Sequence, residues 1–181
     1  MTTTGCDTSK PVLANLLERE LDLNLHTAWV DEDEGLATLP LWNLSGEMVG
    51  YQQYRPFATK ERRNDPRTGR YFTFRPKTEV SVWGLESYHL TPGLLFVTEG
   101  VFCAARLTHR GMSAVAVLGN DPTPSTVAWL RATGRHVVAV CDDDKAGKKL
   151  AKLGNTVVRM CGGDLGDAPA SFVDDLVRRF R

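Results

Sequence analysis

The fold is decided by a ten-residue stretch in the second half of the chain, Ala139-Val140-Cys141-Asp142-Asp143-Asp144-Lys145-Ala146-Gly147-Lys148. It opens with the end of a β-branched, apolar run that starts at His136 and is typical of a buried strand. Three aspartates follow, and then a segment with helical spacing that ends before Gly154. A strand followed by a helix is the repeating unit of an α/β protein, and in this chain acidic residues connect the two.

The same alternation of strands and helices extends on both sides of this stretch. Apolar runs predict strands at 94–98, 114–118, 136–141 and 156–160, and helices are expected at 101–110, 125–133, 145–153 and 171–180. Short β-branched strands with helices between them predict a parallel sheet covered on both faces. The expected fold class is therefore α/β, with a Rossmann-like, mostly parallel four-stranded sheet.

The first half of the chain predicts a smaller antiparallel α+β lobe. A short helix is expected at 11–21, and strand-like runs at 36–42 and 48–54 flank Gly46, which suits a hairpin connection. A further strand is expected at 71–74. We therefore divide the chain into an N-terminal tail with a short helix (1–34), a basic antiparallel lobe (35–90) and the α/β domain (91–181).

The formal net charge of zero hides a basic segment at 55–77. This segment holds eight basic and only two acidic residues, and the basic ones are Arg55, Lys60, Arg62, Arg63, Arg67, Arg70, Arg75 and Lys77. Aromatic residues lie between them, as in surfaces that bind single-stranded nucleic acid or nucleotides. A solvated basic hairpin with core aromatics is the alternative. Lys145 and Lys148 lie beside the aspartates, where they could contact a triphosphate or form an ordinary solvated face.

Composition excludes several classes of protein. No apolar run among the 181 residues approaches the roughly 20 needed to span a bilayer, and the first residues show no export signal. We expect a cytoplasmic protein that is not bound to a membrane. The four cysteines show no spacing typical of a zinc site, so no zinc is expected.

Acidic residues follow three of the predicted parallel strands. They are Glu99, the run Asp142 to Asp144, and the pair Asp164 and Asp167. Ligands bind at the carboxyl ends of such strands. Glu99 alone could be a solvated loop residue, and the aspartate run could cap the next helix. Together these carboxylates would repel one another unless a cation held them, which favours Mg²⁺ and metal-assisted phosphoryl or nucleotidyl transfer.

These residues carry a resemblance to a known family. Val97-Thr98-Glu99-Gly100 and the ten-residue stretch resemble the two signatures of a Toprim domain, and among such domains they are most similar to the DnaG-type primases of bacteria and phages. The resemblance covers about 36–169 and implies that Glu99, Asp142 and Asp144 are catalytic and metal-binding residues. It favours Asp167 over Asp164 as the last metal ligand. It also implies that Gly100 and Gly147 let the backbone turn close to the metal and phosphates.

The resemblance implies a primase that makes short RNA primers on a single-stranded DNA template from ribonucleoside triphosphates. Mg²⁺ or Mn²⁺ would be the cofactor, and phage DNA replication in the bacterial host cytoplasm the setting. The sequence contains no zinc-binding or helicase-docking module, so a replicative helicase and possibly a zinc-binding module are expected to act in trans. Two alternatives stay open: a Toprim nuclease acting on DNA or RNA, and a non-catalytic accessory that binds DNA or a helicase.

Overall fold

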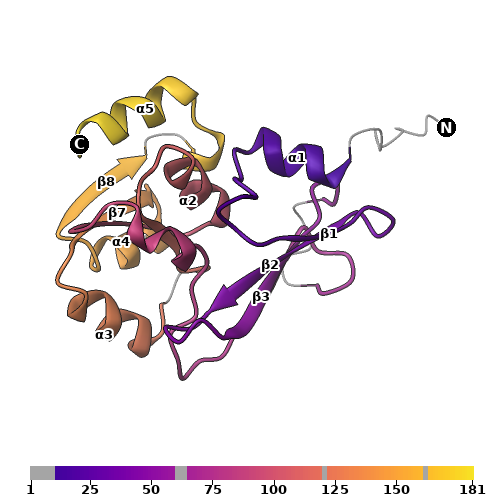
Figure 1. Cartoon of the computed structure of the whole chain (residues 1–181), viewed down its shortest axis with the longest axis horizontal. Coiled ribbons are helices and arrows are strands. Elements are labelled where there is room, and N and C mark those ends of the chain that lie inside the picture. The colour runs from indigo at the N-terminus through magenta and orange to yellow at the C-terminus, as the bar shows by residue number, and fades with distance from the viewer. Residues whose placement is uncertain (1–10, 60–64, 120–121, 161–162) are drawn as a thin grey trace.

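Two four-stranded sheets, one antiparallel and one parallel, lie side by side in the molecule (Figure 1). The computed structural model describes residues 11–59, 65–119, 122–160 and 163–181, with only the backbone of 145 and 146. The antiparallel sheet comes first along the chain and the parallel sheet second. The expected α/β sheet and the antiparallel lobe before it are thereby confirmed.

The N-terminal lobe contains the antiparallel sheet. Its elements are α1 (Val12–Glu18), β1 (Trp29–Asp31), β2 (Leu36–Trp42), β3 (Met48–Tyr54), β4 (Tyr71–Phe74) and the 3₁₀ helix η1 (Leu85–His89). The strands follow one another in the order β1-β2-β3-β4. Strands β2, β3 and β4 begin and end where the sequence predicted. Strand β1 was not predicted and lies within the segment 1–34, yet it pairs with β2 and belongs to this sheet.

The β2–β3 hairpin is fixed by turn chemistry. The backbone N–H of Asn43 donates to the carbonyl of Glu47 at 2.9 Å, and the Asn43 side-chain oxygen accepts from the N–H groups of Ser45 and Glu47. Gly46 takes φ +78°, which a residue with a side chain rarely adopts. The resulting register pairs Leu39 with Gln52 on the buried face of the sheet.

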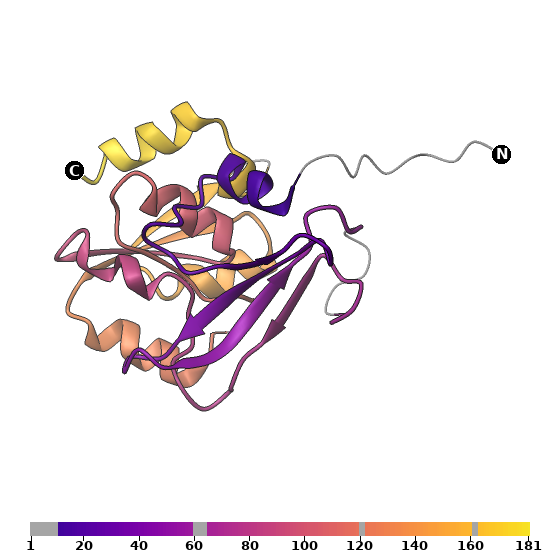
Figure 2. The ribbon, with the colours of Figure 1, turned by 45° about the vertical axis from the view of Figure 1, so that its right-hand side comes forward.

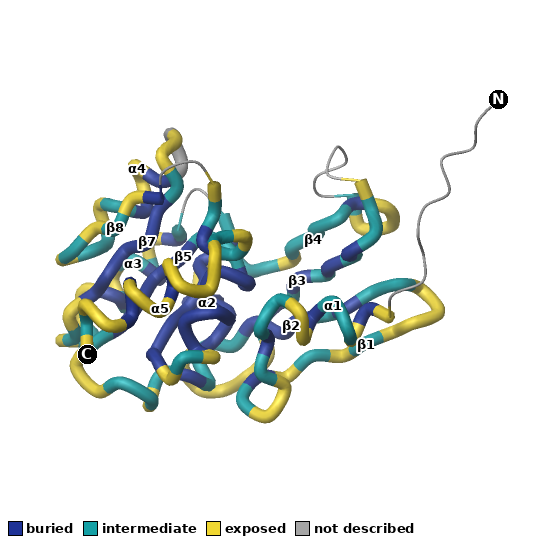
Figure 3. Tube along the Cα trace, turned by 90° about the horizontal axis from the view of Figure 1, so that it is seen from above, coloured by how far each residue is buried: buried dark blue, intermediate teal, exposed yellow. Residues whose placement is uncertain are grey.

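The C-terminal lobe contains the parallel sheet. Its elements are β5 (Leu94–Thr98), α2 (Val101–Thr108), β6 (Ala114–Ala116), α3 (Pro124–Ala132), β7 (His136–Asp142), α4 (Lys145–Ala151), β8 (Thr156–Met160), the 3₁₀ helix η2 (Leu165–Asp167) and α5 (Ala170–Arg178). The strand order is β6-β5-β7-β8. Strand β6 is shorter than predicted, because the chain turns at Leu118, whose φ is +53°. Figure 3 shows that β5, β7 and α2 are largely buried.

Helices cover both faces of the parallel sheet, as the alternation of buried residues requires. Phe96 and Val138 pack in one cluster with α2 and α5, whereas their neighbours Leu95 and Val137 pack with α3 and α4. The first cluster also includes the buried residues of α1, β2 and β3, so the two lobes share one core. Within the described ranges, none of the helices has both the length and the apolar character needed to cross a membrane.

Figure 2 shows the antiparallel sheet beside the C-terminal lobe, and the short segment 82–83 joins the two sheets directly. The N–H of Trp42 in β2 donates to the carbonyl of Val82 at 3.3 Å, and Trp83 exchanges two hydrogen bonds with Ala116 of β6. The Trp83 side chain is completely buried. Because one segment bonds to both sheets, the antiparallel lobe is held in a defined position beside the parallel sheet.

A second connection runs from the end of α1 to α2. The Glu20 carboxylate accepts from Arg106 at 3.2 Å and also forms an ion pair with Arg110, and both arginines are largely buried. Burial alone would raise the pKa of Glu20, but the hydrogen bonds from Arg110 and Arg106 outweigh it and lower that pKa. This carboxylate therefore stabilises the fold in its ionised form.

Replacing Glu20 with Gln is expected to lower the melting temperature at neutral pH. The folded-state pKa of Glu20 is below 4.5, so its contribution is present above that value and is lost as the pH falls through the folded pKa. Thermal unfolding should show the wild type and Glu20→Gln converging below about pH 4.5. Glu34→Gln in the exposed β1–β2 turn is the control and should melt like the wild type. A difference that persists unchanged at low pH would show that the Glu20 charge is not the cause.

Candidate active site

A cavity of about 710 Å³ lies between the two sheets, at the carboxyl ends of the parallel strands. Both lobes contribute to its walls. The lining residues are Arg19, Gln52, Tyr71, Thr73, Arg75, Glu99, Gly100, Val101, Phe102, Cys103, Leu118, Gly119, Val140, Asp142, Met160, Asp164 and Leu165. This is the position at which an open α/β sheet binds ligands.

Three carboxylates line this cavity, and each follows or ends a different parallel strand. Glu99 comes after β5, Asp142 ends β7 and Asp164 comes after β8. Burial raises the pKa of Asp142, and the charges of Asp164 and Asp144 raise it further. The topology therefore brings the predicted residues Glu99 and Asp142 to one cavity, with Asp164 close enough to repel Asp142.

Asp144 has a structural task at the start of α4. Its Oδ1 atom accepts a hydrogen bond from the N–H of Gly147 at 2.7 Å, which makes it the N-cap of the helix. Asp144 is exposed and does not line the cavity. The cap explanation for this aspartate therefore holds in the structure, while its charge still acts on Asp142.

The two candidates for the last acidic ligand take different positions. Asp164 lines the cavity, and its Oδ1 atom also accepts from the N–H of Asp167 at 3.1 Å in η2. The Asp167 carboxylate does not line the cavity and instead forms an ion pair with Arg19, with 3.3 Å between Oδ1 and Nη2. The motif resemblance favoured Asp167, whereas the geometry favours Asp164.

The carboxylates of the cavity supply oxygen ligands of the kind that bind a hard cation such as Mg²⁺. The part of the chain that the structure describes holds no group of three Asp, Glu, His or Cys side chains close enough to bind a metal ion. However, Mg²⁺ usually takes only one or two protein carboxylates and completes its shell with water and substrate phosphates. Oxygen ligands that repel one another, as Asp142 and Asp164 do, fit an ion shared with the substrate.

The two glycines of the motifs differ in whether the fold requires a residue without a side chain at that position. A Cβ on Gly147 would lie 1.9 Å from the carbonyl oxygen of Asp142, so only glycine lets α4 approach the end of β7. A Cβ on Gly100 would have the Cys103 Sγ atom as its nearest neighbour at 3.8 Å, and φ is −105°. Neither the space within the protein nor the backbone conformation requires glycine at Gly100, so the expected role of Gly100 beside a metal and phosphates stays a prediction.

The wall opposite the carboxylates is polar and cationic. The β3–β4 register pairs Gln52 with Thr73, and the Gln52 side chain donates to the Thr73 hydroxyl at 2.8 Å. Arg75 follows β4, and its Nη1 atom donates to the carbonyl of Val117 at 2.6 Å, which joins this wall to the chain after β6. Tyr71 stacks on Tyr54 with ring centroids 5.1 Å apart. Among the described members of the predicted basic set, Arg75 is the one that lines the cavity.

The other predicted basic residues lie elsewhere or outside the described ranges. Arg55 donates to the carbonyl of Pro66 and Arg70 to that of Pro56, both at 3.0 Å, so these two brace the connection between β3 and β4. The exposed members are Arg67, Lys77 and Lys148. The members outside the described residues are Lys60, Arg62 and Arg63, together with the side chain of Lys145.

Sequence reasoning missed three features of this cavity. Arg19 lines it from the end of α1, and no motif marks that residue. Cys103 also lines it, with Sγ 3.8 Å from the Asp164 Oδ1 atom, and burial together with Asp164 raises the thiol pKa to about 12. Leu118 holds a positive φ at the edge of the cavity, a strained conformation that is concentrated at functional sites.

Comparison with known proteins defines the class of this fold. No protein-family model matches the chain. The RNA polymerase domain of Mycobacterium tuberculosis primase DnaG, solved with a DNA duplex bearing a 6-nucleotide overhang, has a TM-score of 0.64 at 18% identity. The match covers 96% of this chain and 74% of that structure. A DnaG primase catalytic domain bound to single-stranded DNA gives 0.58 at 19% identity, over 80% and 53%. The fold is therefore that of a DnaG-type catalytic core.

The sequence gives the more particular relationship. A DNA primase from Thermotoga maritima is 31% identical over 138 residues, which are 75% of this chain and 24% of that primase. The chain thus spans about a quarter of the length of this curated relative. In both sequence and fold, it is similar to the Toprim-containing catalytic core of the DnaG-type DNA primases.

Proposed function

We propose that this chain is the catalytic core of a primase-type nucleotidyltransferase, which joins ribonucleotides into short primers on a single-stranded DNA template. The observation that carries the proposal is one cavity with two unlike walls. The ends of three parallel strands supply Glu99, Asp142 and Asp164, and the antiparallel lobe supplies a cationic wall with Arg75. Such a pair of walls suits a metal ion on one side and phosphates on the other.

We assign the roles of the residues from their positions around the cavity. Asp142 and Glu99 would hold the ion. Asp164 and Asp144 would add negative charge nearby. Bound Mg²⁺ or Mn²⁺ would stabilise negative charge on the phosphate under attack. Arg75, fixed by the Val117 carbonyl, would orient a phosphate from the opposite wall. Thr73 and Gln52 present a hydrogen-bonded pair to the same space.

We infer the wider setting from the relatives together with the resemblance of the motifs. DnaG structures bound to single-stranded or double-stranded DNA support a nucleic-acid template as the partner. We place the activity in DNA replication, with ribonucleoside triphosphates as substrates and a replicative helicase and a zinc-binding module as partners in trans. A phage genome as the origin and a host cytoplasm as the location belong to the same proposal.

The test is incubation with single-stranded DNA, four ribonucleotides and Mg²⁺ or Mn²⁺, with and without a replicative helicase. Labelled oligoribonucleotides support primase activity. A shortened template would support the Toprim nuclease instead, and neither product under any condition would support an accessory that only binds DNA or a helicase. Omission of the divalent ion is the control for metal dependence.

Replacing Arg67 and Lys77 with Ala is expected to weaken binding of single-stranded DNA and to flatten its salt dependence. Both residues are exposed in the basic segment. Each lost phosphate contact should reduce the log–log salt slope by up to about 0.7. Fluorescence anisotropy at several salt concentrations measures the slope. The double variant Arg131→Ala, Arg179→Ala, at exposed positions outside the basic segment, is the charge-matched control. An unchanged slope in the double variant would show that these residues form only a solvated surface.

A further inference from the structure

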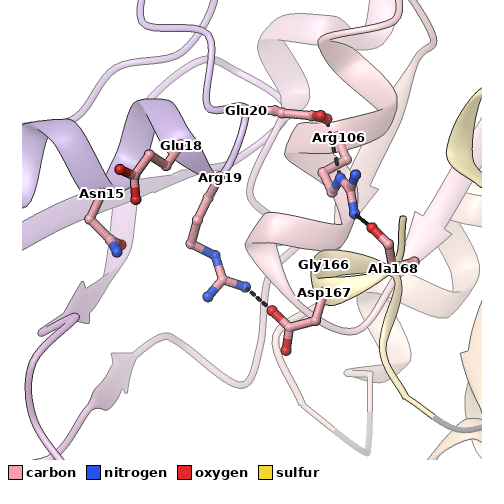
Figure 4. A pocket seen from close by; sticks show the side chains of 8 residues that line it. All are labelled: Asn15, Glu18, Arg19, Glu20, Arg106, Gly166, Asp167 and Ala168. Carbon is pink, nitrogen blue, oxygen red and sulfur yellow. Dashed lines mark hydrogen bonds and ion pairs between the residues drawn. The ribbon is translucent and has the colours of Figure 1, made fainter. Parts of the chain in front are cut away.

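Two further pockets of the molecule differ in the chemistry of their walls. The smaller one, of about 320 Å³, is lined by charged side chains that pair with one another, Arg19 with Asp167 and Arg106 with Glu20 (Figure 4). The larger one, of about 490 Å³, is mainly apolar and lies between the β2–β3 hairpin, η1 and α3. Figure 1 shows the turn of this hairpin beside α3. The larger pocket is thus open to an apolar group from outside the chain.

Aromatic and aliphatic side chains form most of the wall of this larger pocket, which we call the hairpin pocket. Trp42 and Leu44 come from the hairpin, Leu85 and Tyr88 from η1, and Trp129 from α3. The ring centroids of Tyr88 and Trp129 lie 6.1 Å apart. The Leu44 side chain is 56% exposed at the turn. An apolar group that enters the pocket removes this surface from water, which favours binding.

Hydrogen bonds within the chain hold the walls of the hairpin pocket in place. The Trp42 indole donates through Nε1 to the Glu86 Oε1 atom at 2.8 Å, which fixes this ring against η1. The Arg135 guanidinium lies over the Tyr88 ring, 3.4 Å from its centroid, and donates to the Tyr88 carbonyl. Two of the three aromatic walls are therefore anchored. A preformed pocket loses little conformational entropy when a partner binds.

The charge at the hairpin pocket is negative. Burial would raise the pKa of Glu86 in the wall, but the neighbouring His26 and other hydrogen-bond donors outweigh burial and lower it, so this carboxylate is ionised at neutral pH. The Asn43 side chain donates to the exposed carboxylates of Glu47 and Glu79, at 3.0 and 3.5 Å. Among the described residues that line the pocket, none is basic. Cations of a partner would therefore be attracted to the mouth of this pocket.

We infer that the hairpin pocket is a docking site for a protein partner, which presents a short segment with an apolar side chain flanked by lysine or arginine. The apolar side chain enters between Leu44 and Trp129, and the basic side chains meet the carboxylates of Glu47 and Glu79. The same carboxylates repel a polynucleotide, which argues against nucleic acid as the occupant. The inference goes beyond the proposed function, because the pocket shares no lining residue with the carboxylate cavity.

The experiment uses a labelled peptide that is capped at both ends and carries a central Leu-Phe pair between two pairs of lysines. Fluorescence anisotropy compares it with one peptide that has glutamate in place of lysine and another that has serine in place of Leu-Phe. The wild type should bind the first peptide at least about tenfold more tightly than the others. Leu44→Ser should weaken this binding by about fivefold or more, because its apolar contact is lost. Leu17→Ser on α1, where the leucine is 54% exposed, is the matched control.

A double variant tests the charged part of the docking site. Glu47→Gln with Glu79→Gln should weaken binding of the lysine peptide at low salt, and the difference from the wild type should shrink at high salt because exposed charges are screened. Asp33→Asn with Glu34→Gln, in the exposed β1–β2 turn, is the charge-matched control and should bind like the wild type. Thermal unfolding should show that Leu44→Ser and both double variants fold like the wild type.

Several results would overturn the inference. Equal peptide affinity of Leu44→Ser and Leu17→Ser would remove the pocket from binding, and so would a wild type that binds none of the peptides. Equal affinity for the lysine and glutamate peptides would remove the carboxylates. A dimer in sedimentation that Leu44→Ser dissociates would make a second copy the occupant, and loss of single-stranded DNA binding in Leu44→Ser would make it nucleic acid. Peptide binding without primer synthesis would count against the proposed function alone.

Discussion

Replacing Asp142 with Asn is expected to abolish primer synthesis and to weaken Mn²⁺ binding, while the metal-free protein melts at the same or a higher temperature. Asp142 lies at the end of β7 and lines the cavity. Strand β7 is flanked in the sheet by β5, which is followed by Glu99, and by β8, which is followed by Asp164. A bound metal ion supplies several kcal/mol of transition-state stabilisation, so the rate should fall by at least about 100-fold. The two effects have opposite signs because the same charge attracts the metal and repels its neighbours.

The stability effect follows from the pKa of Asp142. Burial raises this pKa, and the charges of Asp164 and Asp144 add to the shift. A carboxyl with a raised folded-state pKa favours the fold below its unfolded-state pKa and loses that contribution as the pH rises through the folded value. At neutral pH Asp142 is therefore ionised at a cost to the metal-free fold. The neutral amide of Asn removes that cost.

The measurement combines calorimetric Mn²⁺ titration with thermal unfolding in the presence and absence of Mn²⁺. Metal should raise the melting temperature of the wild type more than that of Asp142→Asn, since only binding to the folded state stabilises it. Asp143→Asn is the control, because Asp143 is exposed and does not line the cavity. Equal Mn²⁺ affinity in the wild type and in the double variant Asp142→Asn, Asp144→Asn would refute the shared metal site.

The strands that sequence predicts well here are those with a continuous buried face. Strands β2, β3, β4, β5 and β8 have the predicted bounds because apolar or alternating runs are bounded by turn residues. Strand β1 has three residues, too few for a periodic pattern, and its Trp29 is half exposed. It exists because β2 offers an unpaired edge to an adjacent chain segment. Such a strand depends on tertiary pairing and leaves no local signal.

The sequence could predict those residues of the candidate site whose positions depend on the strand topology alone. Glu99 and Asp142 follow neighbouring parallel strands, and such strands necessarily end at one edge. Asp164 and Asp167 could not be separated in this way, because the 3₁₀ turn between them directs one into the cavity and the other to Arg19. Arg19 itself meets Asp167 across 148 positions of the chain. Contacts at that separation arise from packing of the lobes and have no sequence pattern.

The basic and aromatic segment shows what composition leaves undecided. Successive residues of a strand point to opposite faces, and the β3–β4 register places Tyr71 and Thr73 on the cavity side. Phe72 and Phe74 therefore lie on the other face, where they pack near Tyr51 with ring centroids 6.3 and 5.6 Å away. Composition predicted a nucleic-acid-binding or nucleotide-binding surface of cations and aromatics, with a solvated hairpin whose aromatics are core as the alternative. The pleat of the sheet divides it between two faces.

Replacing Gly147 with Ala is expected to destabilise the protein by about 3 kcal/mol or more, although Ala is ordinarily the better residue inside a helix. The added Cβ would lie 1.9 Å from the Asp142 carbonyl oxygen and 3.0 Å from its carbonyl carbon. Both atoms belong to the backbone, so no side-chain rotation relieves the overlap. Either α4 or the end of β7 must move. For a chain of this size the melting temperature should fall by roughly 6–12 °C.

If the end of β7 moves, metal binding should also weaken, because the displaced backbone is that of Asp142 itself. Gly100→Ala is the matched control, since its Cβ meets nothing closer than 3.8 Å and its backbone conformation suits alanine. Thermal unfolding and Mn²⁺ titration of the two variants test the point. If Gly147→Ala melted like Gly100→Ala, the close approach of α4 to β7 would not exist in solution. A variant that is destabilised but binds Mn²⁺ normally would show that α4 yields while Asp142 keeps its place, so the strand end, and not the helix, would set the geometry of the site.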